Sequence, residues 1–303
     1  MTKISTVACV GCGVIGSGWA ALFASRGLRV QAYDPDPGAS AQLERIVAQA
    51  AEALEASAPQ LLGRITLTAD LGAALQSAHF VQECAPDELV LKQKLYSDIG
   101  RLVPPPAVIA SSTSGFPMSQ IQAHCPAPQR TLVAHPINPP YAVPLVEVVG
   151  GALTSAEALE TACTFYRSVG REPLLLHRET FGFVANRLQL ALFREALQMV
   201  ARGEATAAQV DAALMHGIGP RWAAVGAFGA FMLNLAKPDA QGWLAHFEKI
   251  GFGDASVHRE GFGFWDPEVR SAVAAQWMER LAGEDVTELR RRRDTEVLRI
   301  TRR

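Results

Sequence analysis

The chain has 303 residues, of which 49% are hydrophobic and 19% are charged, so it can form one or two globular domains with buried cores. A formal net charge of −2 gives no reason to expect a nucleic acid or a membrane surface as a partner. No apolar run approaches the roughly 18 residues of a membrane span, and the sequence lacks the charged start and apolar centre of a signal peptide. We therefore expect a cytoplasmic protein.

The five cysteines are an odd number and do not indicate a disulfide framework. Cys9 and Cys12 form a C-x-x-C pair, which can bind a metal or undergo redox chemistry. However, Cys9 falls in an expected strand and Cys12 in a glycine-rich loop, and no second pair of ligands follows. We therefore expect neither a metal site nor a redox role.

The N-terminal segment carries a nucleotide-binding pattern. Residues 4–10 are β-branched and apolar, which predicts a strand, and residues 17–26 form an expected helix. Between them, Gly11, Gly13 and Gly16 form the motif G-x-G-x-x-G. Glycines there allow a tight turn and a close approach of the backbone to a pyrophosphate at the N-terminus of the helix.

A second expected strand, residues 29–33, ends at Asp34. This is the place of the acidic residue that accepts hydrogen bonds from the ribose hydroxyls of NAD. Its charge would repel the 2′-phosphate of NADP. The pattern therefore predicts NAD as the cofactor, and a glycine turn without a ligand is the less favoured alternative.

Strands and helices alternate through the rest of the first half, which predicts a parallel sheet with right-handed crossovers. The expected strands are residues 65–67, 79–84, 108–110, 132–134, 145–149 and 173–177, and the expected helices are residues 40–62 (broken near Pro59), 71–77, 87–102 and 155–169. Asp87 is expected in the first turn of its helix, where an acid is favourable. Ligands lie at the carboxyl ends of such strands, where we find Asp34, Glu83, Ser114 and His135.

One stretch combines two ionisable groups with apolar strands. His135 lies at the end of the strand 132–134, and Glu147 interrupts the strand 145–149 beyond a proline-rich loop. A lone carboxylate is costly to bury in an apolar strand unless it is paired, and His135 is the available partner. A carboxylate that binds one imidazole nitrogen makes the other a better base. The pair is a candidate general base; a strand-capping histidine and an exposed glutamate are the alternative.

From residue 180 onward, strand signals give way to helical periodicity. Helices are expected at residues 182–202, 206–215, 221–235, 240–250, 268–281 and 284–299. We interpret the basic run 290–293 as a solvated face or a partner contact. The expected fold is a Rossmann-type, doubly wound α/β domain at residues 1–179, followed by an all-α domain at residues 180–303 that closes the cleft and forms a homodimer contact.

Several motifs along nearly the whole chain carry a family resemblance. They are the glycine fingerprint, S-S-T-S at 111–114, H-P-x-N-P at 135–139, L-V-E-V-V at 145–149 and G-F-V-x-N-R at 182–187. Together they resemble the 3-hydroxyacyl-CoA dehydrogenase family. Within it, residues 135–149 and 219–222 are most similar to the L-gulonate 3-dehydrogenase (lambda-crystallin) branch, with the carnitine dehydrogenases close behind.

The resemblance implies NAD-dependent oxidation of the hydroxyl of an L-3-hydroxy acid, L-gulonate-like, to the 3-oxo acid. It implies that His135 takes the hydroxyl proton, that Glu147 orients the imidazole, and that Ser114 and Asn186 hydrogen-bond the reacting oxygen. For NAD it implies the amides of Val14 and Ile15 together with Asp34, Asp87 and Lys92. Family members often have glutamate at the position of Asp87, which puts that contact in question.

The substrate is only partly readable from the sequence. Gulonate, carnitine and 3-hydroxyacyl thioesters share a hydroxyl β to a carboxyl carbon. Acyl-CoA members of the family place a lysine-rich helical extension after the second strand, whereas residues 36–63 here hold no lysine and only Arg45 as a basic residue. Ser112 stands where the acyl-CoA branch usually has asparagine. Both features favour a free acid over a CoA thioester.

A free carboxylate favours an arginine partner, and Arg221 is the candidate, with a structural arginine at a helix start as the alternative. Carnitine also needs an aromatic or acidic site for its trimethylammonium, which Trp222, Phe228 and Phe231 could form. The run 225–231 is small and apolar, which disfavours a sugar acid and leaves a less polar 3-hydroxy acid open.

A catalytically silent protein that binds NADH, or a purely structural one, is the alternative from another class. A silent protein would need no general base. The intact set of Ser114, His135, Glu147 and Asn186 therefore argues for an enzyme.

Overall fold

The computed structural model describes residues 4–233 and 235, together with isolated positions between 275 and 300. Packing divides the chain into two units, Met1–Ala191 and Leu192–Arg303, and each is considered by itself. The domain boundary expected between residues 179 and 180 stays a prediction. A division by packing does not show which part of the chain folds on its own.

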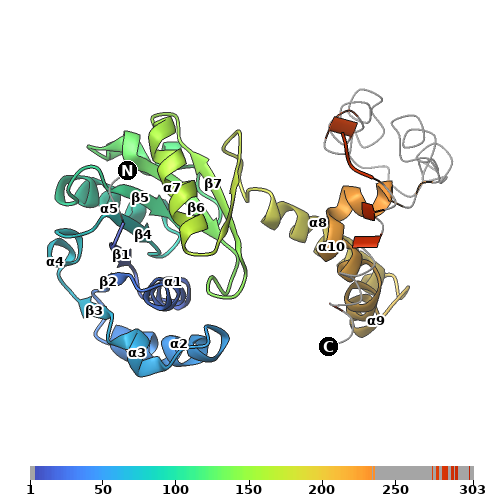
Figure 1. Cartoon of the computed structure of the whole chain (residues 1–303), viewed down its shortest axis with the longest axis horizontal. Coiled ribbons are helices and arrows are strands. Elements are labelled where there is room, and N and C mark those ends of the chain that lie inside the picture. Colours follow the sequence, from blue (N-terminus) through green and yellow to red (C-terminus); the bar gives the residue numbers. More distant parts are fainter. Residues whose placement is uncertain are drawn as a thin grey trace. The chain divides into compact units, whose positions relative to one another are not determined.

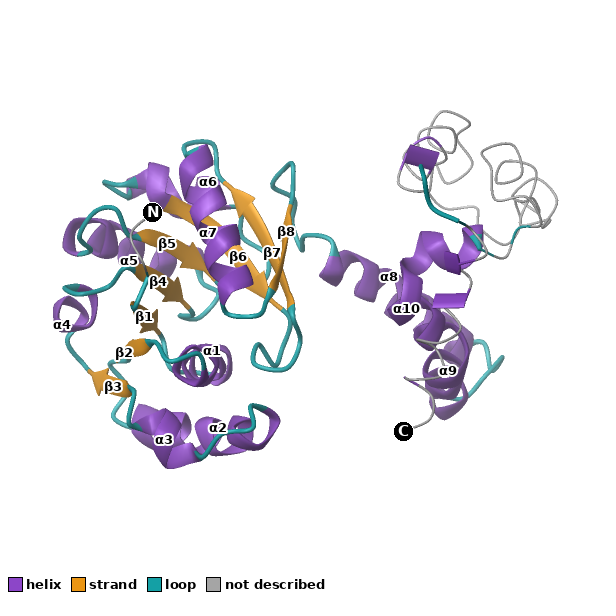
Figure 2. Ribbon diagram, viewed as in Figure 1, coloured by secondary structure: helices purple, strands orange, loops and turns teal. Residues whose placement is uncertain are grey.

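The first unit is built on an eight-stranded sheet with the order β3-β2-β1-β4-β5-β6-β7-β8 (Figures 1 and 2). Neighbouring strands of this sheet are parallel, apart from β6 and β7, which form an antiparallel hairpin. The strands are β1 (Thr6–Val10), β2 (Arg29–Tyr33), β3 (Ile65–Thr68), β4 (Phe80–Glu83), β5 (Val108–Ser111), β6 (Thr131–Pro136), β7 (Leu145–Gly150) and β8 (Glu172–Leu175).

Apart from α6, for which no helix was expected, the helices of this unit lie close to the expected positions. They are α1 (Val14–Ser25), α2 (Ala39–Ala53), α3 (Ala58–Leu62), α4 (Leu71–Leu75), α5 (Leu89–Leu102), α6 (Met118–Ile121) and α7 (Ala156–Ser168), with short 3₁₀ turns at Gln122–His124 and Pro128–Arg130. The break expected near Pro59 separates α2 from α3, because Pro59 fits the first turn of α3 but not the interior of a longer helix.

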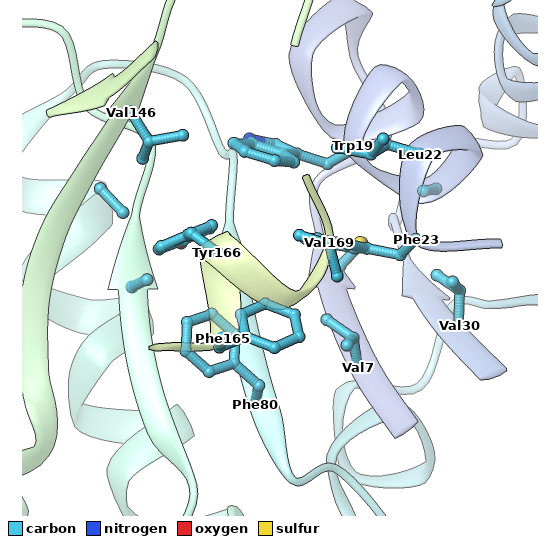
Figure 3. Packing of buried hydrophobic residues seen from close by; sticks show 14 of the residues in the cluster. Val7, Trp19, Leu22, Phe23, Val30, Phe80, Val146, Phe165, Tyr166 and Val169 are labelled. Carbon is cyan, nitrogen blue, oxygen red and sulfur yellow. The ribbon is translucent and has the colours of Figure 1, made fainter. Parts of the chain in front are cut away.

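Two apolar clusters cover the two faces of the sheet. Alternate residues of β1 enter different clusters, Val7 and Cys9 one and Ala8 and Val10 the other, as the period of a strand requires. Figure 3 shows the first cluster, in which aromatic rings from α1, β4 and α7 pack together. These rings are Trp19, Phe23, Phe80, Phe165 and Tyr166. Strands β1 and β4 to β7 are therefore buried on both sides, whereas the edge strands β3 and β8 are partly exposed.

The chain continues through α8 (Ala185–Ala201), α9 (Ala207–Ala213), a π-helical turn (Leu214–Ile218) and α10 (Gly219–Met232). Thr206 begins α9 with a capping box, since its hydroxyl accepts the amide of Gln209 and the Gln209 side chain accepts the amide of Thr206. Gly226 interrupts α10 with φ 73°, ψ 170°, which only glycine adopts readily. The described residues contain no helix that could cross a membrane.

Three expectations need correction or fall outside the described residues. The helix expected from residue 182 begins at Ala185, because Gly182 and Phe183 have positive φ angles. The helix expected from Asp87 begins at Leu89, with no acid in its first turn. The helices expected at 240–250, 268–281 and 284–299 lie largely outside the described residues.

Candidate active site

The glycine motif forms a close-packed turn between β1 and α1. Gly11 has φ 97°, and a Cβ there would lie 2.8 Å from the backbone of Cys84. A Cβ on Gly16 would lie 1.8 Å from the carbonyl oxygen of Gly11. A Cβ on Gly13, in contrast, meets nothing within 4 Å. Two glycines thus allow the tight turn, and the third leaves the backbone open to a ligand.

The start of α1 supplies the donors that a pyrophosphate needs. Val14 and Ile15 lie in its first turn, where amides have no acceptor within the helix. Asp34 follows β2, and its carboxylate accepts hydrogen bonds from the amides of Cys12, at 2.7 Å, and Asp36, at 2.9 Å. Each oxygen keeps a lone pair for a ribose hydroxyl. The residues present fit NAD, although their individual contacts stay predictions.

His135 and Glu147 face each other directly across the β6–β7 hairpin. The Nδ1 atom of His135 lies 2.8 Å from Oε2 of Glu147, and both side chains are buried. The register of the hairpin therefore explains the pairing expected from the sequence. The alternative of an exposed edge glutamate is wrong, because Glu147 is 0% exposed.

Glu147 has a second set of partners. Its Oε1 atom accepts the backbone amides of Val184, at 2.8 Å, and Ala185, at 2.9 Å, where α8 begins. Burial raises the pKa of Glu147, but the hydrogen bonds from His135 and from these amides outweigh burial and lower the pKa below its ordinary value. An ionised Glu147 requires His135 to donate from Nδ1, which leaves Nε2 free to accept a proton.

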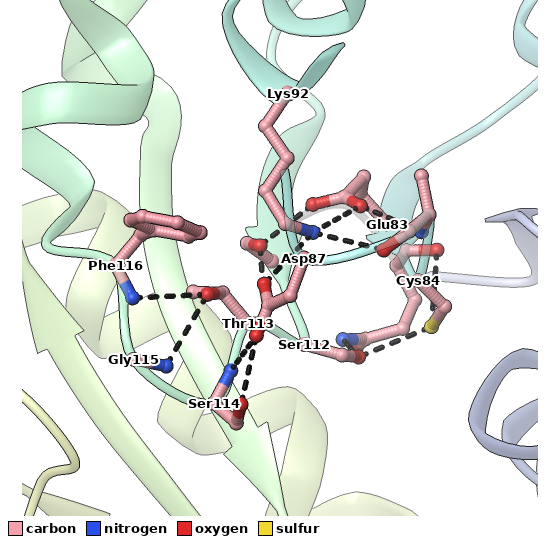
Figure 4. Close-up of polar contacts among 12 residues, drawn as sticks. Glu83, Cys84, Asp87, Lys92, Ser112, Thr113, Ser114, Gly115 and Phe116 are labelled. Carbon is pink, nitrogen blue, oxygen red and sulfur yellow. Dashed lines mark hydrogen bonds and ion pairs between the residues drawn. The ribbon is translucent and has the colours of Figure 1, made fainter. Parts of the chain in front are cut away.

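Ser114 lies beyond β5 and is bound to Asp87 (Figure 4). The Ser114 hydroxyl donates to Oδ2 of Asp87 at 2.7 Å, and the Ser114 amide donates to the same oxygen at 2.9 Å. Partial burial raises the pKa of Asp87, but hydrogen bonds from Thr113 and Ser114 and the charge of Lys92 lower it overall. Because its single proton is given to Asp87, the Ser114 hydroxyl offers a ligand a lone pair.

Lys92 is buried beneath this pair. Its ammonium lies 2.8 Å from Glu83, 3.1 Å from the carbonyl oxygen of Ala85 and 3.5 Å from Asp87. Glu83 in turn accepts the hydroxyl of Ser111 at 2.6 Å. Two of the three ammonium protons of Lys92 are donated to Glu83 and to Ala85, and the ammonium also forms a longer ion pair with Asp87, so a direct contact with NAD would compete with these partners.

Asn186 joins the two groups of polar residues. Its side-chain Nδ2 donates to the backbone carbonyl of Ser114 at 3.3 Å, while the amides just before it bind Glu147. The first unit therefore brings together four of the residues expected to act on the substrate: Ser114, His135, Glu147 and Asn186.

Arg221 lies in the second unit, in the first turns of α10. Its Nη2 atom donates to the carbonyl of Ala230 at 3.0 Å, across the interruption at Gly226. This contact agrees with the alternative interpretation of Arg221 as a structural arginine near the start of a helix. The carboxylate contact of Arg221 stays a prediction.

The sequence reasoning missed Phe183 and the bond between Asp87 and Ser114. Phe183 falls within the helix expected at residues 182–202, but it precedes α8, which begins at Ala185. Its ring lies 5.3 Å from the ring of His135, centroid to centroid. The only sequence signal was a glycine just before it, at a place where helical periodicity had already begun.

The comparisons with known proteins agree with this geometry. Residues 6–180 match the model of the NAD-binding domain of 3-hydroxyacyl-CoA dehydrogenase, and residues 182–260 match the model of its C-terminal domain. The chain belongs to the 3-hydroxyacyl-CoA dehydrogenase family. As a member of this family it is an NAD-dependent oxidoreductase that acts on a CH–OH group.

Three relatives show how far the similarity extends. The chain is 43% identical over 307 residues to an L-carnitine dehydrogenase of Streptomyces griseus, with 99% of this chain and 90% of the relative covered. It is 42% identical over 252 residues to a 3-hydroxyacyl-CoA dehydrogenase of Gibberella moniliformis, with 82% and 78% covered. Among solved structures, 5-formyl-3-hydroxy-2-methylpyridine 4-carboxylic acid 5-dehydrogenase, an NAD⁺-dependent dismutase, matches with a TM-score of 0.74 at 27% identity, with 99% of this chain and 98% of that chain covered.

Proposed function

We propose that this dehydrogenase oxidises the hydroxyl of a free L-3-hydroxy acid to the 3-oxo acid, and that L-carnitine is its substrate. The observation that carries the reaction is the buried pair of His135 and Glu147, joined at 2.8 Å through Nδ1. This contact leaves Nε2 as a base at the carboxyl end of β6, where ligands of such sheets bind. The identity to the Streptomyces enzyme supports carnitine.

His135 takes the hydroxyl proton of the substrate at Nε2 as the hydride leaves the carbinol carbon, and a carbonyl group forms. Glu147 stabilises the imidazolium that results. NAD, when bound, supplies the hydride acceptor. Asn186 has a second amide proton for the reacting oxygen, while Ser114 accepts a hydrogen bond from a ligand donor. Since the reaction releases a proton, oxidation becomes more favourable as the pH rises.

Two sequence features support a free acid. Residues 36–63 contain no lysine that could bind CoA phosphates, and their basic residue is Arg45. The second feature is α10, which carries Arg221 together with the aromatic residues Trp222, Phe228 and Phe231. An arginine and aromatic rings are the groups that recognise a carboxylate and a trimethylammonium.

The test is NADH formation at pH 9 with a panel of substrates: L-carnitine, L-gulonate, L-3-hydroxybutyrate, longer 3-hydroxy acids and 3-hydroxybutyryl-CoA. We expect kcat/KM to be highest for L-carnitine. A preference for 3-hydroxybutyryl-CoA would overturn the free-acid proposal and point to the activity named for the Gibberella relative. A preference for L-3-hydroxybutyrate would support a free acid as the substrate but contradict recognition of a trimethylammonium group.

L-Gulonate is the second candidate. Residues 135–149 resemble the gulonate branch. Ser112 also fits that branch, because the acyl-CoA enzymes usually have asparagine at this position. The small, apolar run 225–231 offers few partners for the hydroxyls of a sugar acid, so we place gulonate after carnitine.

Arg221→Met tests the carboxylate contact. If Arg221 binds the acid, the variant should raise KM for the acid much more than KM for NAD. Equal increases would assign Arg221 to the structure of α10, through its bond to Ala230.

His135→Asn tests the assignment of His135 as the general base. We expect NADH to bind as in the wild type while turnover collapses, because the groups expected to bind the cofactor are the Asp34 carboxylate and the amides at the start of α1. Turnover at the wild-type rate would contradict the assignment of the base.

We also infer a homodimer in the cytoplasm. A helical second domain often forms the dimer contact in two-domain dehydrogenases. Light scattering after size-exclusion chromatography tests the dimer, since a single chain has a mass of 32.5 kDa.

A further inference from the structure

The turn that precedes α8 has an unusual backbone. Gly182 and Phe183 have φ angles of 72° and 48°, and the amide of Phe183 donates to the carbonyl of Thr180 at 3.2 Å. Glycine adopts a positive φ readily, but a bulky residue rarely does. Phe183 is therefore in a conformation that its own side chain disfavours.

The Phe183 side chain is buried against the base. It is 0% exposed, and its ring lies 5.3 Å from the ring of His135 at an interplanar angle of 39°. Packing of this kind restricts rotation of the imidazole, which the bond to Glu147 restrains at one atom only.

The backbone after Phe183 meets the other member of the pair. The next two amides, those of Val184 and Ala185, donate to Oε1 of Glu147 at 2.8 and 2.9 Å. They lie at the N-terminal end of α8, where the helix dipole favours a negative charge. One short turn thus contacts both members of the pair, by a ring on His135 and by two amides on Glu147.

Burial in the core does not by itself explain this arrangement. A phenylalanine can be buried from a right-handed backbone without strain. Strained conformations persist where the surroundings over-determine them, and they cluster at functional sites. Here the left-handed turn leads directly into the two amides that bind Glu147, and the ring lies beside His135.

We propose that Phe183 is a positioning residue for the dehydrogenase reaction: its ring fixes the orientation of His135, and its left-handed backbone brings two amides to Glu147. The inference rests on the proposed role of His135 as the base. It goes beyond that role because it names the residue that keeps the pair aligned for proton transfer.

Four variants distinguish the effect of the ring from the effect of the backbone conformation and from a general loss of stability. Phe183→Gly removes the ring and permits the left-handed turn, whereas Phe183→Ala removes the ring and keeps the strain. Phe183→Leu keeps most of the buried apolar volume without a flat ring. Ile121→Ala is the matched control, because Ile121 is buried in the same apolar cluster.

The first measurement needs no substrate. The ring ¹⁵N signals of His135, assigned as those missing from His135→Asn, report which nitrogen carries the proton. We expect one tautomer, with the proton on Nδ1, in the wild type and in Ile121→Ala. The Gly and Ala variants should show a mixture of tautomers, because an imidazole that can rotate no longer keeps its Nδ1 proton on Glu147. This measurement does not depend on the substrate panel. A failure of the proposed function can therefore be told apart from a failure of the proposal for Phe183.

The second measurement is kinetic. We expect kcat to fall about 100-fold in the Gly and Ala variants, as for a misplaced catalytic group, while the Kd for NADH stays within about twofold of the wild type. Phe183→Leu should recover most of the Tm but not kcat. Ile121→Ala should lower the Tm and keep kcat.

Two results would overturn the proposal. One is a Phe183→Gly variant with wild-type kcat and a single His135 tautomer. The other is a Leu variant whose kcat recovers in proportion to its Tm, because that outcome assigns Phe183 to stability alone.

Discussion

The two carboxylate oxygens of Glu147 bind different parts of the first unit. Oε2 accepts from His135, and Oε1 accepts from the amides of Val184 and Ala185. These bonds lower its pKa against the effect of burial. The charge of Glu147 therefore stabilises the folded state above the ordinary pKa of about 4.3, and this contribution is lost as the pH falls through the lowered pKa.

Glu147→Gln tests this linkage. We expect the variant to have a lower Tm than the wild type at neutral pH, because glutamine carries no charge and can accept at only one atom. The difference should begin to shrink as the pH falls below the ordinary pKa of about 4.3, where the unfolded chain takes up a proton, and should be lost once the pH passes the lowered pKa of the folded state. Thermal unfolding between pH 3 and 7 measures it. The exposed Glu160→Gln in α7 is the control, and a Tm difference that is independent of pH would contradict the argument.

Asp34 is the residue that should set the choice between NAD and NADP. Asp34→Asn retains an oxygen for the amide of Cys12, which lies 2.7 Å from the carboxylate, but removes the negative charge. Repulsion of a nearby phosphate in water is worth about 1 kcal/mol, so the preference for NAD over NADP should fall about five- to tenfold. Kd values for both cofactors measure this, and an unchanged ratio would place the 2′-phosphate away from Asp34.

Single residues also show what the sequence could and could not predict. The pairing of His135 with Glu147 was predictable, because each interrupts an apolar strand and the two strands are consecutive. The bond from Ser114 to Asp87 was not, because it joins loops that follow strands β5 and β4 and depends on the rotamer of a short side chain. Asp87 was expected to stabilise a helix start, but its carboxylate is occupied by Ser114.

At the level of elements, β4 and α5 are joined by a buried ion pair. Lys92 and Glu83 lie 2.8 Å apart, with side chains 1% and 0% exposed. Attraction between buried charges offsets the cost of removing them from water only while both partners are present. The position of the loop between β4 and α5, which carries Asp87, therefore depends on both Lys92 and Glu83 keeping their charges.

Lys92→Met should lower the free energy of unfolding by about 3–5 kcal/mol, because it leaves the carboxylate of Glu83 buried and unpaired. Lys94→Met, on the exposed side of the same helix, should change it by less than about 0.5 kcal/mol. Urea denaturation measures both. The double variant with Glu83→Gln should recover part of the loss, and no recovery would mean that the ammonium is needed by another group.

The expected elements match the structure best where apolar runs are long. All eight strands of the sheet lie within or near the expected ranges. The start of α8 was misplaced by three residues, from 182 to Ala185, because apolar periodicity includes Phe183 although its φ of 48° is not helical. Periodicity reports which side chains are apolar and carries no information about the sign of φ.

At the scale of the whole molecule, the residues expected to bind NAD and those proposed to transfer the proton lie in different parts of the first unit. The former lie around β1, α1 and β2 and in the segment from β4 to α5, while His135 and Glu147 lie in the β6–β7 hairpin. The two functions should therefore be separable by mutation, although they share one sheet.

NADH should stabilise the wild type and His135→Asn equally. At 100 times Kd, a ligand that binds only the folded state adds about 2.7 kcal/mol to the free energy of unfolding. Thermal shift with increasing NADH measures this in both proteins. A smaller shift in His135→Asn would show that the imidazole contributes to cofactor binding.

The tie between Glu147 and the amides of Val184 and Ala185 also determines where members of this family can be recombined. A chimera that joins one member's sheet to another's helices at residue 180 would separate the carboxylate from the turn that was selected with it. A crossover after Ala191, where the first unit ends, transfers the turn together with its partner. In such a chimera the proposed base, its carboxylate and the turn that binds the carboxylate all come from a single parent.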